Sequence, residues 1–335
     1  MEIDFHHHAT YLIAVLAGIA PHEAAVLAHA CQLTDDNTRT CRIDHGLAST
    51  FVTTISQAAD PLRCPGVSQR IFCLFHFPPG NPEAARNLRR DGQTHPLVCT
   101  PGGEAADRLL DTALASGDLY RLGLACHTFA DAFAHQNFVG GTTAFNGLRP
   151  GPHGPIPRLG HEDAGAAPDD PLACWTDPRL REPVVRCAGR FLDAARGLYR
   201  RLSRHSLLSP ARQEETPEAC LARDLTRALG LEDPGRPDMA ERMRRLEALA
   251  LTPRYGWHPM PDYSPTAWFD AAVAVTGPYS PADGISAPFW NCRWRSPETR
   301  TESHWYRFQK AVSGHAVDML AHLGPRLAGV SLPDW

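Results

Sequence analysis

Apolar residues along most of this chain recur three or four positions apart, the spacing of an amphipathic helix. The pattern predicts two helices within 8–33, broken at Gly18 and Pro21. Further helices are predicted over 104–116, 118–138, 180–206, 217–230, 237–250 and 300–324. Alternation typical of strands is rare, so we expect only short strands, near 51–56 and 70–77. The pattern therefore predicts a mainly α fold, a helical bundle with long ordered loops.

The segment 139–178 breaks the helical pattern. It is rich in glycine, proline and aspartate, and it contains His153, His161 and several acids. Loops of this length in compact proteins usually serve a function. We expect the segment to be ordered, to form a wall of the active site and to bring His161 to a metal ion.

The chain shows no internal repeat, low-complexity tract or linker, and its 335 residues are enough for one large core. We expect a single metal-binding α-helical domain over 1–335. Its metal ligands would fall mostly within 1–170, and the helices of 180–325 would complete the bundle.

Composition excludes several classes of protein. A hydrophobic content of 43% and a charged content of 21% are typical of a globular protein rather than a disordered one. A net charge of −4 gives no electrostatic case for nucleic acid as an obligate partner. Lys310 is the only lysine, and it stands in no Gly-Lys-Ser/Thr motif. The chain therefore offers neither a P-loop nor a credible Schiff-base lysine.

Cysteine usage and the N-terminal pattern indicate a cytoplasmic protein. None of the ten cysteines forms a C-x-x-C pair. Five lie among apolar residues, as buried thiols do in a reducing compartment: Cys31, Cys73, Cys126, Cys187 and Cys220. The apolar run Ala9–Ala20 follows acids and histidines, and the first basic residue is Arg39, whereas a secretory signal needs a basic start. No apolar run approaches the roughly 18 residues of a membrane span.

Three metal-type residues lie four positions apart in one apolar, proline-free run: His127, Asp131 and His135. Steps of four on a helix advance by about 40°, so these side chains share one face. The rise from His127 to His135 is about 12 Å, too far for both to bind one ion, whereas Asp131 between them can bridge two ions. A polar stripe on a surface helix is the alternative. Because the run holds few charged residues, we expect a multinuclear metal site on a buried helix.

Other candidates are spread along the first half of the chain. Asp35 and Asp36 follow a helix end, where adjacent acids are either a solvated turn or the carboxylates that a multinuclear cation site needs. His76 lies in an apolar, strand-like run, and we interpret it as a core histidine with satisfied hydrogen bonds rather than a ligand. Histidines and acids also gather from Asp4 to His8, and His161-Glu162-Asp163 followed by Asp169-Asp170 offers a further cluster of candidate ligands. Among these, we expect His7 and His8 to be structural or supporting residues.

Taken in order, these motifs resemble an uncharacterised microbial family related to the zinc-dependent phospholipase C and P1 nuclease group, and to glycosylphosphatidylinositol-specific phospholipase D. The resemblance covers roughly the first 170 residues and rests on five stretches: Asp4-Phe-His6, Gln32-Leu-Thr-Asp35-Asp36, Phe75-His76-Phe77-Pro-x-Gly80, the His127 helix with Gln136-x-Phe138, and Gly160-His161. It implies an all-α fold that holds three metal ions, typically zinc, which activate water for phosphodiester cleavage.

Two features depart from that group. Its phospholipases and nucleases are secreted and use the amine of an N-terminal tryptophan as a ligand, whereas this chain starts with Met1. We expect His6, with Asp4 as a second candidate, to take that place. The group also carries a histidine followed four residues later by an acid. Here Gly165 stands at that distance from His161, so the partner of His161 stays open.

We therefore expect a metal-dependent hydrolase in which two or three zinc ions lower the pKa of bound water to about 7. The substrate would be a small molecule, and the phosphoester class rests on the resemblance alone. Asp36 is the expected general base. The expected metal ligands are His6, Asp35, Asp36, His127, Asp131, His135 and His161.

Other functions fit the same ligands. A cytoplasmic tailoring enzyme that acts on an amide or ester of a small metabolite is one, and the scarcity of lysine favours it mildly, because phosphate-rich polymers usually meet mixed basic surfaces. An iron-dependent oxidase is another, since histidine and carboxylate ligands suit zinc, iron and manganese alike. A binding module without catalysis is the last. The sequence predicts no oligomeric state.

Overall fold

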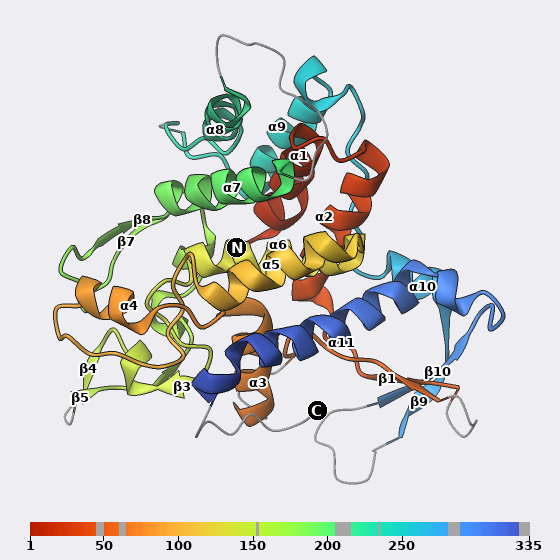
Figure 1. Cartoon of the computed structure of the whole chain (residues 1–335), viewed down its shortest axis with the longest axis horizontal. Helices are drawn as coiled ribbons and strands as arrows, with labels where there is room; N and C mark the ends of the chain where they lie inside the picture. The colour runs from red at the N-terminus through yellow and green to blue at the C-terminus, as the bar shows by residue number, and fades with distance from the viewer. Residues whose placement is uncertain are drawn as a thin grey trace.

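A computed structural model describes residues 1–44, 50–59, 65–151, 154–204, 216–233, 235–280 and 289–327. Over these residues the expected mainly α fold is confirmed (Figure 1). The α-helices are α1 Thr10–Leu16, α2 Pro21–Asp36, α3 Pro65–Ile71, α4 Pro82–Leu88, α5 Glu104–Ser116, α6 Leu119–Ala134, α7 Cys187–Ser203, α8 Pro217–Ala228, α9 Met239–Ala250, α10 Ala267–Ala272 and α11 His304–Leu323. Two π-helices accompany them, η1 Asp4–Ala9 and η2 Phe72–His76.

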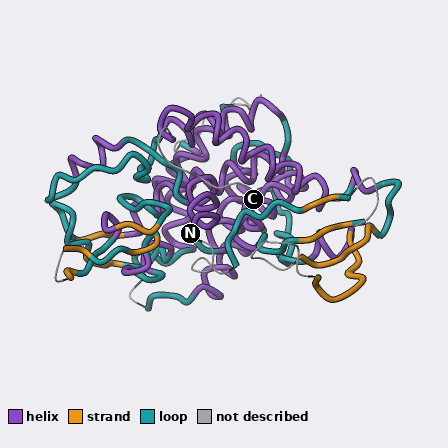
Figure 2. The backbone as a smooth tube through the Cα atoms, turned by 90° about the horizontal axis from the view of Figure 1, so that it is seen from below, coloured by secondary structure: helices purple, strands orange, loops and turns teal. Residues whose placement is uncertain are grey.

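The described strands are short and form small sheets on two sides of the helical body (Figure 2). One sheet has the order β2-β1-β10-β9, in which β1 and β10 are parallel. The others pair β3 with β6, β4 with β5 and β7 with β8. The strands are β1 Cys41–Ile43, β2 Phe51–Val52, β3 Thr142–Thr143, β4 Pro150–Gly151, β5 Gly154–Pro155, β6 Arg158–Leu159, β7 Cys174–Thr176, β8 Val184–Arg186, β9 Val273–Ser280 and β10 Phe289–Trp294.

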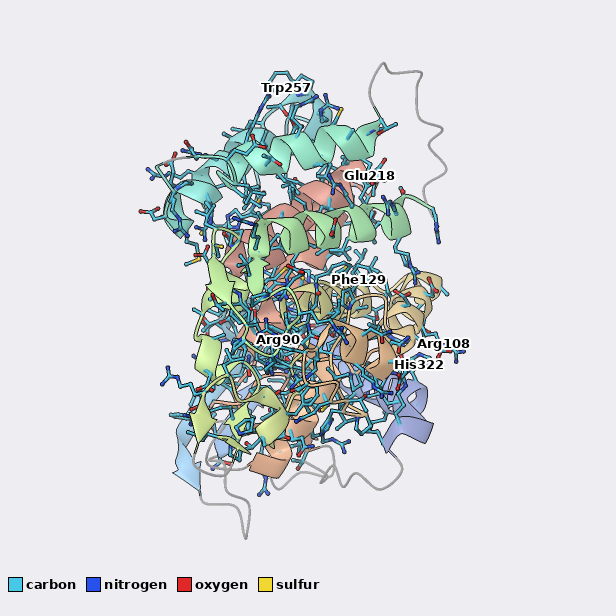
Figure 3. The ribbon with its side chains drawn as sticks, turned by 90° about the vertical axis from the view of Figure 1, so that its left-hand side faces the viewer. Arg90, Arg108, Phe129, Glu218, Trp257 and His322 are labelled. Carbon is cyan, nitrogen blue, oxygen red and sulfur yellow. The ribbon has the colours of Figure 1, made fainter. Side chains whose placement is uncertain are left out.

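Helix α6 lies at the centre of the bundle and packs against α2, α5, α7 and α11. Asp118 caps its N-terminus by accepting hydrogen bonds from two backbone amides. Nearly all of its residues are buried, including Phe129, which lies among the helices in Figure 3. At Gly123 an added Cβ would lie 2.5 Å from the carbonyl oxygen of Leu27. Glycine therefore allows α6 and α2 to approach closely and brings the acidic end of α2 towards the centre of α6.

The prediction of a strand near 70–77 is wrong, because this stretch forms the end of α3 and the π-helix η2. Its apolar residues are buried on several sides, and periodicity alone does not distinguish such a run from a buried strand. The strand expected at 51–56 is confined to Phe51–Val52. Strands β9 and β10 lie in a segment for which the sequence predicted none.

The described residues of the segment 139–178 make several hydrogen bonds from side chains to backbone carbonyls. The side-chain amide nitrogen of Asn146 donates to the carbonyl oxygens of Val139, Gly141 and Arg158. Arg89 and Arg179 both donate to the carbonyl oxygen of Phe145, Arg179 at 2.8 Å. His153, named above in this segment, lies outside the described residues.

The helices share one large hydrophobic core, with buried members from Met1 to Leu323. Among the described residues, every helix is too short or too polar to cross a membrane.

Candidate metal centre

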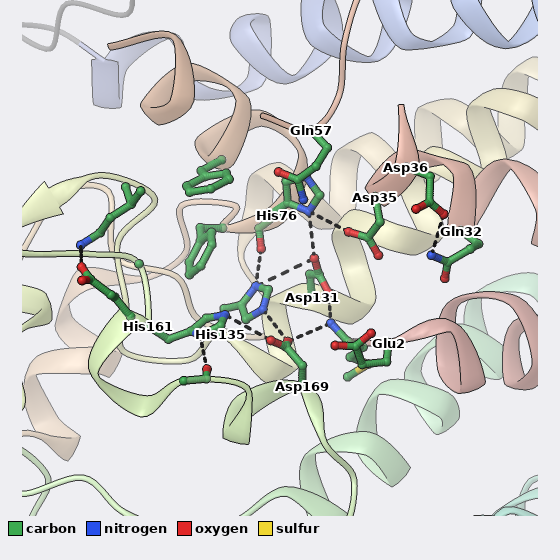
Figure 4. A pocket seen from close by; sticks show the side chains of 17 residues that line it. Glu2, Gln32, Asp35, Asp36, Gln57, His76, Asp131, His135, His161 and Asp169 are labelled. Atoms are coloured by element: carbon green, nitrogen blue, oxygen red, sulfur yellow. Dashed lines mark hydrogen bonds and ion pairs between the residues drawn. The ribbon is translucent and has the colours of Figure 1, made fainter. Parts of the chain in front are cut away.

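Asp131, which is 1% exposed, lies at the middle of a group of histidines (Figure 4). Its Oδ1 atom is 3.1 Å from Nε2 of His6. Its Oδ2 atom is 3.1 Å from Nε2 of His127 and 3.3 Å from Nδ1 of His76. The histidines come from η1, α6 and η2, so Asp131 gathers segments that are far apart in the sequence.

Three groups of side chains within the described residues have ligand atoms close enough to hold a metal ion. In each group these atoms lie within 4.8 Å of one another. The groups are His6 with Cys31 and His127, Asp35 with His76 and His127, and His135 with His161 and Asp169. Imidazole, thiolate and carboxylate are ligands of zinc and of other transition metals.

Four of these histidines use one ring nitrogen to bond a backbone carbonyl. His127 Nδ1 lies 3.0 Å from the Cys31 oxygen, and His76 Nε2 lies 2.8 Å from the Ser56 oxygen. The remaining two are His135 Nδ1 to the His76 oxygen at 2.6 Å and His161 Nδ1 to the Gly165 oxygen at 2.9 Å. A carbonyl oxygen only accepts, so each of these nitrogens carries the hydrogen. In a neutral ring the other nitrogen then presents a lone pair to the centre, as in metal-bound histidines.

The lone pairs of two histidines face each other. Nδ1 of His76 and Nε2 of His127 are 3.1 Å apart. Both nitrogens also lie near Asp35, at 3.6 Å and 3.7 Å from its Oδ1 atom. When both rings are neutral, these two nitrogens and the carboxylates of Asp35 and Asp131 are all acceptors, and none of the four groups has a hydrogen to donate. A cation at this position would satisfy all four groups.

The α-amino group of Met1 lies at the same centre. It is 2.8 Å from Oδ1 of Asp131 and 3.0 Å from Oδ1 of Asp169. Burial lowers the pKa of this amine, but the carboxylates of Asp131, Asp169 and Asp35 outweigh it and hold the pKa well above its usual range. Burial alone would raise the pKa of Asp131. The Met1 ammonium and the rings of His127 and His135 outweigh burial and hold this pKa well below its usual range. The centre is therefore a strongly anionic site that attracts positive charge.

A cavity of about 550 Å³ opens beside these donors. Phe72 and Phe77 supply apolar wall, and Leu159 with Gly160 brings in the segment 139–178. Besides Asp131, the polar side chains that line the cavity without belonging to the three groups are Glu2, Gln32, Asp36, Gln57 and Glu162. Among the described residues that line it, none is a lysine or an arginine.

The chain belongs to the DUF6765 family. The model of this family, described as a family of unknown function, matches residues 1–323. No curated protein and no solved structure matches the chain.

In this DUF6765 chain, six of the seven expected ligands meet at the centre. They are His6, Asp35, His127, Asp131, His135 and His161. The seventh, Asp36, lies outside the three groups. It is exposed, and its Oδ2 atom accepts hydrogen bonds from Tyr263 at 2.6 Å and from Gln32 at 3.1 Å. Its carboxylate is therefore held at the cavity wall, one residue beyond Asp35.

The DUF6765 centre also includes two side chains that the sequence reasoning did not select as ligands. His76, interpreted as a core histidine, faces Asp35 and Asp131. Asp169 is the open partner of His161: its Oδ2 lies 3.2 Å from His161 Nε2, and its Oδ1 lies 2.9 Å from His135 Nε2. The signal for Asp169 was its place in an acidic pair after His161. Helical periodicity did not point to it, because Gly165 and Pro168 lie between His161 and Asp169.

Other candidates in the DUF6765 chain make different contacts. Asp4 pairs with Arg242 at 2.6 Å and lies outside the three groups. Asp163 accepts from Arg158. His8 lies 3.3 Å from an oxygen of Glu247. Asp4, His8 and Asp163 therefore belong to none of the three groups, whereas His6 does.

Proposed function

We propose that this protein is a metal-dependent hydrolase that holds two or three zinc ions at the three ligand groups and cleaves a phosphoester of a small molecule. The observation that carries the proposal is the pair of facing nitrogens on His76 and His127, 3.1 Å apart beside Asp35 and Asp131. Each nitrogen is aimed inward by a carbonyl on the far side of its ring. This arrangement suits a bound cation, because the second nitrogen of a metal-bound histidine is typically held by such a carbonyl.

The layout favours more than one ion. Asp131 directs Oδ1 towards His6 and Oδ2 towards His127 and His76. One carboxylate thus serves two groups of nitrogens, as a bridging ligand does. The third group is built around Asp169, which receives His135 on one oxygen and His161 on the other.

Bound zinc ions would lower the pKa of a coordinated water to about 7 and polarise the scissile group. The chain's own residues would do the rest. We assign proton acceptance to Asp36, because its carboxylate lies at the cavity wall but outside the ligand groups. Both hydrogen bonds from Tyr263 and Gln32 fall on Oδ2 and fix the orientation of the carboxylate. Phe72 and Phe77 exclude water from one side of the cavity.

The proposed fold type is that of the zinc-dependent phospholipase C and P1 nuclease group. The donors follow the order of the motifs that carried the resemblance, and the Met1 amine contacts Asp131 and Asp169, which supports a comparison with the N-terminal amine ligand of that group. The absence of lysine and arginine from the described cavity lining favours a small phosphoester over a phosphate-rich polymer.

Metal analysis and a hydrolysis assay test this function together. Metal-free protein is titrated with zinc, iron(II) or manganese(II), and each form is assayed with bis(p-nitrophenyl) phosphate and with p-nitrophenyl acetate. We expect at least two zinc ions per chain and faster release from the phosphodiester. Binding of fewer than two ions would sink the multinuclear site. Hydrolysis of the acetate alone would favour the amide or ester alternative, and activity that needs iron and oxygen would favour the oxidase.

A further inference from the structure

Helix α9 lies in the second half of the sequence, yet it contacts two segments that supply donors to the centre. Its residue Arg242 is buried, and its Nε atom donates to Oδ2 of Asp4 at 2.6 Å. The NH1 atom of the same guanidinium lies 3.7 Å from Oδ1 of Asp170. The Arg242 side chain therefore contacts both η1, near the N-terminus, and Asp170, in the later part of the segment 139–178.

The two acids that Arg242 touches are close in sequence to donors of the centre. Asp4 begins η1, the π-helix that carries His6. Asp170 directly follows Asp169, which faces His135 and His161. The positions of His6 and Asp169 are thus coupled to Arg242 through one or two residues of backbone.

Neighbouring contacts strengthen this link. Glu247, also on α9, lies 3.3 Å from Nε2 of His8 in η1. Arg236, just before α9, donates to the carbonyl oxygen of Leu172 at 2.6 Å. The amide of Leu172 in turn donates to Oδ1 of Asp170 at 3.0 Å. Side chains of α9 and of Arg236 just before it therefore contact both η1 and the turn at 169–172.

Asp4 depends strongly on this partner. It is 0% exposed, and its Oδ1 atom has no hydrogen-bond partner among the described residues. A buried carboxylate needs a paired charge, and a guanidinium offers a planar set of donors that can serve two acids in a fixed geometry. A lysine ammonium in the same place is a single point charge on a flexible stem.

We propose that Arg242 is a positioning residue of the metal centre, which sets the distance between the His6 arm and Asp169 by joining Asp4 to Asp170. This inference rests on the proposed function, since it concerns the donors for the metal ions. It assigns to the second half of the chain a part in building the centre. Arg242 itself is not a ligand, and it acts through the backbone on either side of the two acids.

The test measures metal binding. Wild type, Arg242→Met, Arg242→Lys, Asp4→Asn/Arg242→Met and the control Arg245→Met are prepared metal-free and checked for helical content. Arg245 lies on the same helix but forms partly exposed pairs with Glu241 and Asp233. Each protein is titrated with zinc against a chromophoric chelator, and with cobalt(II) while its visible spectrum is recorded.

We expect Arg242→Met to bind at least one ion roughly tenfold more weakly and to change the cobalt spectrum, since loss of supporting contacts typically lowers metal affinity 10- to 100-fold. Arg242→Lys should show a smaller loss, and Arg245→Met none. The double variant has no unpaired charge at Asp4 yet should still bind weakly, because the link to Asp170 is missing. If Arg242→Met does not fold, Arg242→Lys and the double variant decide the matter.

Wild-type affinities and spectrum in those two variants, or in folded Arg242→Met, would overturn the proposal. Full recovery in the double variant alone would also overturn it, because Arg242 would then only neutralise Asp4. A wild-type chain that binds no ion contradicts the proposed function as well, whereas normal wild-type binding with unaffected variants contradicts only the role of Arg242.

Discussion

Nε2 of His135 lies 2.9 Å from Oδ1 of Asp169, and this contact joins the end of α6 to the end of the segment 139–178. His135 is the C-cap residue of α6, where the backbone leaves the helical conformation. Its other nitrogen bonds the carbonyl oxygen of His76. The C-cap residue of α6 therefore links η2 to the segment 139–178, and we expect substitutions of its partners to alter metal binding.

Asp131→Asn should remove at least one bound zinc ion, and more metal than His7→Ala or His8→Ala. An amide lacks the charge needed to serve His6 on one side and His127 on the other. Elemental analysis after dialysis against a weak chelator measures the loss. Equal metal content in all three variants would show that Asp131 is not a bridging ligand.

Tyr263→Phe should lower kcat on a phosphodiester by roughly tenfold and leave zinc stoichiometry unchanged; the loss is smaller than the roughly 10²- to 10⁴-fold that a general base contributes, because Asp36 itself stays in place. The tyrosine hydroxyl donates to Asp36 at 2.6 Å, and Asp36 lies outside the ligand groups. Tyr306→Phe, on α11 and outside the cavity lining, is the matched control. Metal loss in Tyr263→Phe would mean that the tyrosine supports the ligands instead.

Protease protection of the segment 139–178 should depend more on Asn146 than on metal. The Asn146 side chain bonds three backbone carbonyls of the segment, and Arg179 fixes Phe145. Limited proteolysis of wild type should give similar cleavage with and without chelator, whereas Asn146→Ala should be cut within the segment. Cleavage of wild type only after chelation would show that the bond from His161 to a metal is the main anchor.

Acid should destabilise the fold through His315. This buried imidazole stacks on Phe75, and burial lowers its pKa to about 3, although its hydrogen bond to Leu74 acts the other way. Because the unfolded pKa is near 6.5, the stabilisation is complete above that pH and is lost as the pH falls from 6.5 towards 3. Between pH 7 and pH 5 this amounts to about 2 kcal/mol of unfolding free energy.

Urea unfolding at pH 7, 6 and 5 measures that dependence. His315→Gln removes the titrating group, so its unfolding free energy should fall less steeply with pH than that of wild type. His258→Gln, at an exposed position, should leave the slope unchanged. Parallel slopes for wild type and His315→Gln would contradict the assignment.

Local signals in the sequence were sufficient for the helices with clear boundaries. Helix α5 occupies Glu104–Ser116 as expected, since Gly117 adopts φ 65° and ends it. The residues His127 and Asp131 share a helical face as their spacing required, and both are buried at the centre. In such places the local pattern and the tertiary packing agree.

The remaining parts of the centre depend on features that helical periodicity does not encode. His6 and His76 lie on π-helical turns, which break the 3.6-residue period and recur at functional sites. Asp169 reaches His161 across a turn at Gly165 and a short 3-10 helix, Ala167–Asp169. Arg242 reaches Asp4 over 238 positions. Only the folded chain reveals these partners.

The parallel pairing of β1 with β10, in which Cys41 aligns with Trp290, has a consequence for the newly made chain. At the usual 5–20 residues per second, β1 leaves the ribosome roughly 12 to 50 s before its partner has been synthesised. Cys41 and Ile43 are buried in the finished sheet, but during that interval β10 is not there to cover them. Until β10 is made, one edge of β1 lacks its neighbouring strand, and an unpaired edge of this kind can pair with other chains.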